Sequence, residues 1–255
     1  MMRRYGIVLT TSALVIALTM CSSSASTPHA GAAASACPLP TFGPGDEYHP
    51  EFDPSTFTAN IDNPWLPFQP GTTLVYTGTK DGKSALDVET VSARTRKIDG
   101  VQTRVVEDRL FLDNALEERT NDYYAQDACG NVWYFGEDTA TLDEHGKVQD
   151  RSGSFHAGVK GAQPGVFMQA RPELDRWFRQ EWFKGEAEDQ FRVIDLNTKA
   201  KVPYGSFGHA LRTEEKTELE PDVLDNKLYV RGIGEVLEES VKGPVERLEL
   251  VDVIR

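Results

Sequence analysis

The sequence predicts an all-β protein built on one antiparallel sheet, either a barrel or a strongly curved open sheet. From residue 72 onward, short β-rich runs, several with alternating apolar and polar residues, are separated by turn residues about every ten positions. Helix signals are scarce, and only residues 172–177 have a pattern that could begin a short helix. The mature chain, roughly 220 residues, is long enough for one substantial core.

Residues 1–36 have the composition of a secretory signal peptide followed by a Ser/Ala-rich linker. Arg3 and Arg4 precede an apolar stretch that is short for a membrane span. Two processing routes are open. One is a lipoprotein cleavage box that would leave a lipid anchor on Cys21, and the other is an ordinary signal-peptidase site at residues 34–36. Both routes predict an extracytoplasmic protein, either secreted or lipid-anchored.

Residues 37–71 are rich in proline and also contain Phe52, Phe57, Trp65 and Phe68. Disordered segments are poor in aromatic residues, so we expect an extended arm that packs these rings onto the domain. The antiparallel β domain then covers residues 72–255. Besides a central hairpin, its predicted strands are 73–79, 85–95, 101–112, 148–155, 177–183, 190–196, 209–219, 224–231, 235–241 and 245–254.

The central hairpin, residues 117–138, combines more aromatic and ionisable side chains than any other stretch. Its turn, residues 127–131, has Asp first and Gly130 fourth, which suits a type I turn followed by a left-handed residue and a bulge. This turn places Tyr124 opposite Tyr134.

Alternation then divides the hairpin into two faces. The first, with Trp133, Phe135 and Glu137, is expected to face the core, where Glu137 would need an arginine such as Arg119 or Arg179 to keep a normal pKa. The second face is amphipathic and consists of Asp122, Tyr124, Gln126, Val132, Tyr134 and Gly136. A slip of one residue would instead pair Asp122 with Glu137.

The chain has three cysteines, Cys21, Cys37 and Cys129. If Cys21 is lipidated or removed, an even number remains in an oxidising compartment, which favours a Cys37–Cys129 disulfide. Two unpaired thiols are the alternative.

The formal net charge of −13 argues against nucleic acid and anionic membrane surfaces as partners. A membrane would then be contacted only through a lipid on Cys21. The charge permits cationic or neutral small molecules and metal ions. No cofactor is predicted, and no residue is assigned to a metal, although calcium is possible at the carboxylate clusters.

No P-loop, nucleophile elbow or metal-binding motif is present. Acid–base chemistry would have to use Asp122 or Glu137 together with His156 or His209. A ligand site would use an aromatic-lined cavity with a few polar groups. The residues predicted for it are Tyr124, Gln126, Trp133, Tyr134, Glu181 and Trp182. The alternative is that the aromatic residues fill the core and the acidic residues are solvated.

Two segments carry a resemblance. Residues 63–73, with Asn-Pro-Trp-Leu-Pro and Pro-Gly-Thr-Thr, and residues 126–137, with Gly-Asn-Val-Trp-Tyr-Phe-Gly-Glu, resemble a largely uncharacterised family of exported bacterial β-proteins. At the level of fold, the pattern is similar to lipoprotein-carrier-like half-barrels, which implies a cavity for lipids or other apolar ligands. The resemblance implies no catalytic residues.

Three functions are consistent with these observations. The leading hypothesis is an exported protein that binds a small apolar or amphipathic ligand in a β-lined cavity. The second is a secreted hydrolase, lyase or cyclase that uses the carboxylates and histidines named above. The third is a structural or interaction module without a small-molecule site.

Overall fold

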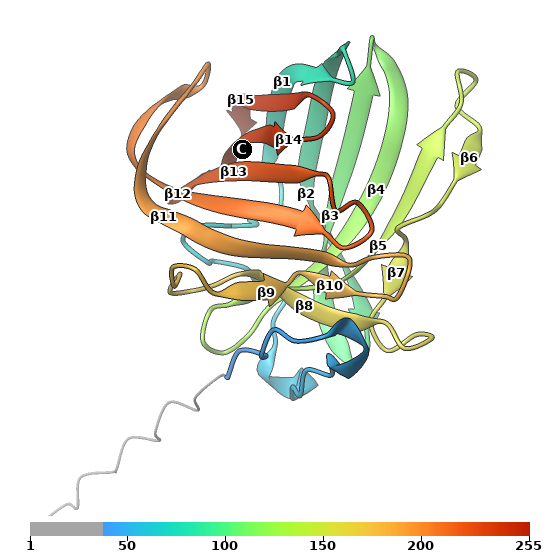
Figure 1. Ribbon diagram of the computed structural model, residues 1–255, viewed down its shortest axis with the longest axis vertical. Coiled ribbons are helices and arrows are strands. Elements are labelled where there is room, and N and C mark those ends of the chain that lie inside the picture. The colour runs from blue at the N-terminus through green and yellow to red at the C-terminus, as the bar shows by residue number, and fades with distance from the viewer. Residues whose placement is uncertain (1–37) are drawn as a thin grey trace, which may run out of the picture. The chain divides into compact units, whose positions relative to one another are not determined.

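The computed structural model describes residues 38–255 (Figure 1). The described chain contains fifteen strands and two short 3-10 helices, and no α-helix. In chain order the elements are η1 Gly45–Glu47, η2 Pro54–Thr56, β1 Thr73–Lys80, β2 Lys83–Ile98, β3 Val101–Leu112, β4 Ala115–Gln126, β5 Val132–Leu142, β6 Val148–Asp150, β7 Phe155–His156, β8 Gln163–Met168, β9 Trp177–Arg179, β10 Glu181–Trp182, β11 Asp189–Val202, β12 Gly205–Thr217, β13 Leu224–Val230, β14 Gly234–Lys242 and β15 Glu246–Ile254.

The strands form one antiparallel sheet in the order β10-β8-β5-β4-β3-β2-β1-β15-β14-β13-β12-β11-β9. Its two ends meet in one segment, because β9 pairs with β11 and β10 pairs with β8 while only Gln180 separates β9 from β10. The sheet therefore curves into a nearly closed barrel, as Figure 1 shows. The predicted fold class is confirmed.

The arm packs against the sheet as predicted. Ile61, Trp65, Leu66 and Phe68 are buried in the main core. Asn63 is 1% exposed, and its side-chain oxygen accepts hydrogen bonds from the backbone N–H groups of the residues two and three positions later. Its amide nitrogen donates to the Gly130 carbonyl at 2.8 Å, which ties the arm to the turn of the central hairpin.

Buried apolar side chains form two clusters. The first includes arm residues together with side chains of β3, β4, β5 and β8, among them Val106, Trp133 and Phe135. The second includes Leu74 and Tyr76 of β1 with buried side chains of β11 to β15. The inward positions of β2, β3 and β4 outside these clusters include the carboxylates Asp87, Glu89, Asp108 and Asp122.

Several predicted elements differ from the observed ones. Residues 148–155 are divided between β6 and β7, and residues 177–183 between β9 and β10. The predicted strands 190–196 and 209–219 are parts of a longer hairpin, β11–β12, and residues 172–177 form no helix. Strand β8 was not predicted, because Pro164 and Gly165 are typical of turns. Gly165 is required there, since a Cβ atom would lie 2.2 Å from the Arg179 carbonyl oxygen.

The central hairpin contains both predicted registers. Next to the turn, Tyr124 pairs with Tyr134, and Gly130 has φ +88°, as the first register requires. A bulge then shifts the pairing so that Asp122 lies opposite Glu137. Gly136 forms this bulge with φ +141°, and a Cβ there would lie 2.3 Å from a backbone carbonyl oxygen of β7. The bulge reverses the direction of the side chains that follow it.

Candidate binding cavity

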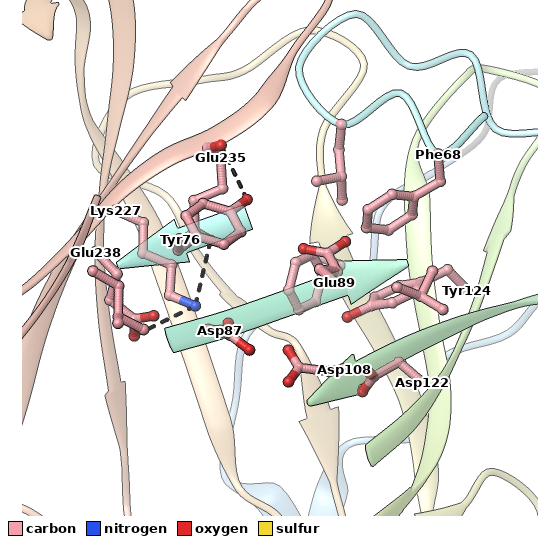
Figure 2. Close-up of a pocket in the computed structure, with 14 residues that line it drawn as sticks. Phe68, Tyr76, Asp87, Glu89, Asp108, Asp122, Tyr124, Lys227, Glu235 and Glu238 are labelled. Carbon is pink, nitrogen blue, oxygen red and sulfur yellow. Dashed lines mark hydrogen bonds and ion pairs between the residues drawn. The ribbon is translucent and has the colours of Figure 1, made fainter. Parts of the chain in front are cut away.

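A cavity of about 130 Å³ lies inside the barrel between the two apolar clusters (Figure 2). It shares Lys227 and Glu238 with a hollow of about 200 Å³, and Glu238, Asp87, Asp108 and Asp122 with another of about 210 Å³. Its polar wall consists of Asp87, Glu89, Asp108, Asp122, Lys227, Glu235 and Glu238. Its apolar wall consists of Leu66, Phe68, Tyr76, Val106, Tyr124, Phe167 and Leu248.

Strand β2 points two carboxylates into this cavity, although carboxylates usually lie on the exposed face of a strand. Asp87 and Glu89 share a face with Ala85 and Val91, which are both buried. Leu86, on the opposite face, is 38% exposed. Burying leucine and exposing the two acids would be the usual arrangement, so the orientation of β2 runs against the ordinary packing preference.

One oxygen on each of these two acids is buried without a hydrogen-bond partner among residues 38–255. The atoms are Asp87 Oδ1 and Glu89 Oε1. Buried carboxylate oxygens are normally hydrogen-bonded, paired with a cation or bound to a metal. Figure 2 shows Asp87 next to Asp108, and Glu89 above Asp108 and Asp122.

Burial and like charge raise the pKa values of these carboxyl groups. Burial, followed by the charges of Asp108 and Asp122, raises the pKa of Glu89 to about 8. Burial, followed by the charge of Asp108, also raises the pKa of Asp122 to about 8, although a hydrogen bond from Tyr134 opposes the shift. Burial and the neighbouring Asp108 raise the pKa of Asp87 well above its ordinary value. Glu89 and Asp122 therefore hold protons near neutral pH.

Lys227 is the cation on the cavity wall, and three other carboxylates hold it. Its Nζ lies 3.5 Å from Glu238, 3.6 Å from Glu235 and 3.8 Å from Glu215. Burial lowers the pKa of Lys227, but the charges of these acids outweigh that effect and raise the pKa overall. Because its charge is already balanced, Lys227 leaves Asp87 and Glu89 without a paired cation.

The apolar end of the cavity is made of stacked and edge-on rings. Tyr124 stacks on Tyr134 with ring centroids 4.8 Å apart. It also contacts Phe68 of the arm at 4.9 Å and Phe167 of β8 at 5.0 Å. Leu66 and Phe68 together close this end, so the arm contributes directly to the cavity wall.

Three residues of the central hairpin meet at the carboxylate wall. Tyr134 donates a hydrogen bond through its hydroxyl group to Asp122 at 2.6 Å, and that hydroxyl lies 3.2 Å from Glu137. Glu137 lines the adjoining hollow instead of lying beside Trp133 and Phe135, because the bulge at Gly136 reverses its direction. Its pKa is raised well above the ordinary value, by burial first and then by Asp122, and no arginine pairs with it among the described residues.

The other residues predicted to bind a ligand lie outside this cavity. Gln126 holds the arm, accepting from the backbone N–H of Asp62 and Asn63 and donating to the Asp62 carboxylate. Trp133 donates through Nε1 to a carboxylate of the hairpin turn at 3.1 Å. Trp182 packs under the Arg179 guanidinium at 4.6 Å.

Glu181 is also buried outside the cavity, and its pKa is raised well above the ordinary value, by burial first.

The two histidines proposed for acid–base work also lie elsewhere. The Nε2 atom of His156 is 3.0 Å from Asp138, in a partly exposed network with Tyr123 and Arg96. His209 is exposed on β12 beside Asn197. Neither lines the cavity that contains Asp122, so the structure does not bring together the predicted carboxylate–histidine pair.

No group of three or more His, Cys, Asp or Glu side chains within residues 38–255 is placed to hold a metal ion. No helix in that part of the chain is long and apolar enough to cross a membrane. Cys21 and Cys37 lie outside the described residues, so the lipid anchor and the Cys37–Cys129 disulfide stay predictions.

Comparison with known proteins gives two structural likenesses. A protein proposed to be exported, with a YmcC-like fold, from Bacteroides fragilis is 14% identical, with a TM-score of 0.43 over 75% of this chain and 99% of that one. A protein proposed to be a lipoprotein, from Parabacteroides distasonis, is 9% identical, with a TM-score of 0.39 over 74% of this chain and 97% of that one. No family model and no curated protein matches the sequence. Neither likeness is close enough to transfer a function.

Proposed function

We propose that this chain is an exported binding protein whose cavity holds a small amphipathic molecule with a positively charged group. The cation, such as a protonated amine, lies against Asp87 and Glu89. Its apolar part lies against the rings of Phe68, Tyr124 and Phe167. The observation that carries the proposal is that Asp87 Oδ1 and Glu89 Oε1 are buried without a hydrogen-bond partner among the described residues, although the Asp87 carboxyl group also shares a hydrogen bond with Asp108.

The energetics favour a cationic ligand over a neutral or anionic one. A carboxylate that loses water without gaining a partner is strongly destabilising, so Glu89 and Asp122 stay largely protonated near neutral pH. A buried ammonium group would replace those protons and pair with the carboxylates at close range. An anion would meet several acids and only one lysine, which is already balanced. The overall charge of −13 also favours the approach of cations.

Matched six-carbon probes separate the alternatives. We expect hexylamine to bind measurably in isothermal titration calorimetry at pH 7.5, and hexanol and hexanoate to bind at least tenfold more weakly. The double variant Asp87→Asn/Glu89→Gln should lower hexylamine affinity at least tenfold, because it removes the counter-charge and keeps the side-chain shape. Glu186→Gln, at an exposed turn position, is the control and should bind like wild type.

Two results would overturn the proposal. One is equal binding of hexylamine and hexanoate, which would show that the carboxylates do not select charge. The other is hexylamine binding that survives in the double variant, which would place the amine elsewhere. If hexylamine binds as expected, mass spectrometry of molecules that co-purify with the exported protein would identify the natural ligand among amines of suitable size.

A further inference from the structure

The outer part of the β11–β12 hairpin has the opposite charge to the rest of the protein. We call residues 196–212 the basic hairpin. It carries Lys199, Lys201, His209 and Arg212 and contains no Asp or Glu, in a chain with a formal charge of −13. No ion pair formed within the described residues includes either lysine or Arg212. Arg212 lies opposite Asp195 in the β11–β12 ladder, whereas Lys199 and Lys201 have no ion-pair partner within the described residues.

The basic hairpin has one face with buried side chains and one face with exposed side chains. Ala200, Val202 and Ala210 are buried in the second apolar cluster. Lys199 and Lys201 alternate with the buried residues and are exposed on the opposite face. Figure 1 shows the hairpin (orange) curving away from β13.

The tip adds an apolar contact to the charge. Tyr204 is 41% exposed and follows the exposed Pro203. Its backbone N–H donates to the Leu250 carbonyl at 3.0 Å, so the tip is fastened to β15. Leu196, at the base of the basic hairpin, is 40% exposed. The surface thus presents lysines, a tyrosine and aliphatic groups on a preformed support.

We propose that the basic hairpin docks the protein on a bilayer that contains anionic phospholipid. Lysines place their stems along apolar groups and their ammonium groups near phosphates, and tyrosine is favoured at the headgroup level. A flat membrane can be touched by one hairpin while the acidic remainder faces water. A nucleic acid would track along more of the acidic surface and be repelled. The expectation from net charge alone, that anionic surfaces are excluded, does not apply to this hairpin.

Vesicle co-sedimentation tests the proposal. The protein would be purified after export, without its signal peptide and with Cys21→Ser, so that neither the apolar signal segment nor a lipid anchor contributes. The vesicles would be pure phosphatidylcholine or would contain about 30% phosphatidylglycerol as the anionic lipid. We expect binding only to the anionic vesicles, with loss at high salt. Lys199→Gln/Lys201→Gln should lower the partition coefficient about 30-fold, since each lysine near an anionic surface contributes about a factor of five.

The control is Lys97→Gln/Lys160→Gln, which removes two exposed lysines outside the basic hairpin. It should partition within about twofold of the parent, because charge loss alone has little effect at a distance. Equal urea midpoints for both double variants would show that folding is intact. Equal losses of binding in the two double variants would refute the assignment, as would binding to pure phosphatidylcholine or no binding at all.

Discussion

Glu89 is one of the cavity carboxyl groups whose titration is expected to affect folding stability. Its pKa is about 8 in the folded protein and has its ordinary value, about 4.5, in the unfolded chain. Between these pH values the folded protein holds a proton that the unfolded chain has lost. Its contribution to stability is therefore complete below about pH 4.5 and is lost as pH rises toward 8.

The interval between the two pKa values sets the magnitude. At about 1.36 kcal/mol per pH unit, it corresponds to a loss of up to about 5 kcal/mol in the free energy of unfolding. Glu89→Gln keeps the shape of the side chain and removes its titration. We expect the variant to match the wild type near pH 5 and to be more stable by several kcal/mol at pH 8.

Urea unfolding followed by tryptophan fluorescence at pH 5, 6, 7 and 8 measures this difference. Glu186→Gln, an exposed Glu→Gln change, should keep the pH dependence of the wild type. If wild type and Glu89→Gln show parallel dependence on pH, then Glu89 titrates normally and the electrostatic account of the cavity is incorrect.

Three further predictions concern the framework of the cavity. Gly136→Ala should lower the free energy of unfolding by more than about 1 kcal/mol in urea titrations, because it strains a positive-φ bulge; Gly208→Ala, with open space around it, should cost less. Asn63→Ala should lower it by about 2–3 kcal/mol and expose the arm to limited proteolysis, since buried backbone donors lose their acceptor; an arm that stays protected would contradict this. Mass spectrometry after alkylation without reductant should show no alkylated Cys37 or Cys129, and reduction should lower stability by about 4 kcal/mol; two alkylated thiols would rule out the disulfide.

The fold class could be predicted because strand length, alternation and turn residues are local properties. Residues 101–112 were predicted with the observed bounds, since Asp-Gly and Asp-Asn turns mark both ends. The turn of the central hairpin followed from Gly130. The bulge at Gly136 could not be predicted in the same way, because a glycine inside a strand is consistent with either register until the partner strand is known.

The cavity residues were harder to recognise. Apolar and acidic residues alternate along strand β2, with Leu86 and Val88 on one face and Asp87 and Glu89 on the other. The usual preference would place the apolar face in the core, whereas in the barrel the acidic face points inward. Two alternate carboxylates between Ala85 and Val91 were the available signal, and it becomes informative only once the inward face is known. Of the predicted cavity residues, Asp122 and Tyr124 are on the wall because their alternation was correct.

The ladder between β1 and β15 is a seam of the barrel, in the sense that it joins the first strand of the chain to the last. Every other ladder between named strands of residues 73–255 joins segments that are near neighbours along the chain, whereas this ladder joins the first strand to the last. The entropic cost of bringing distant segments together therefore falls mainly on one ladder, so we expect the barrel to close there late in folding. A circular permutation would have to keep the arm, because Leu66 and Phe68 line the cavity. Its linker would therefore run from the end of β15 to the start of the arm, and new ends could be opened at an exposed turn.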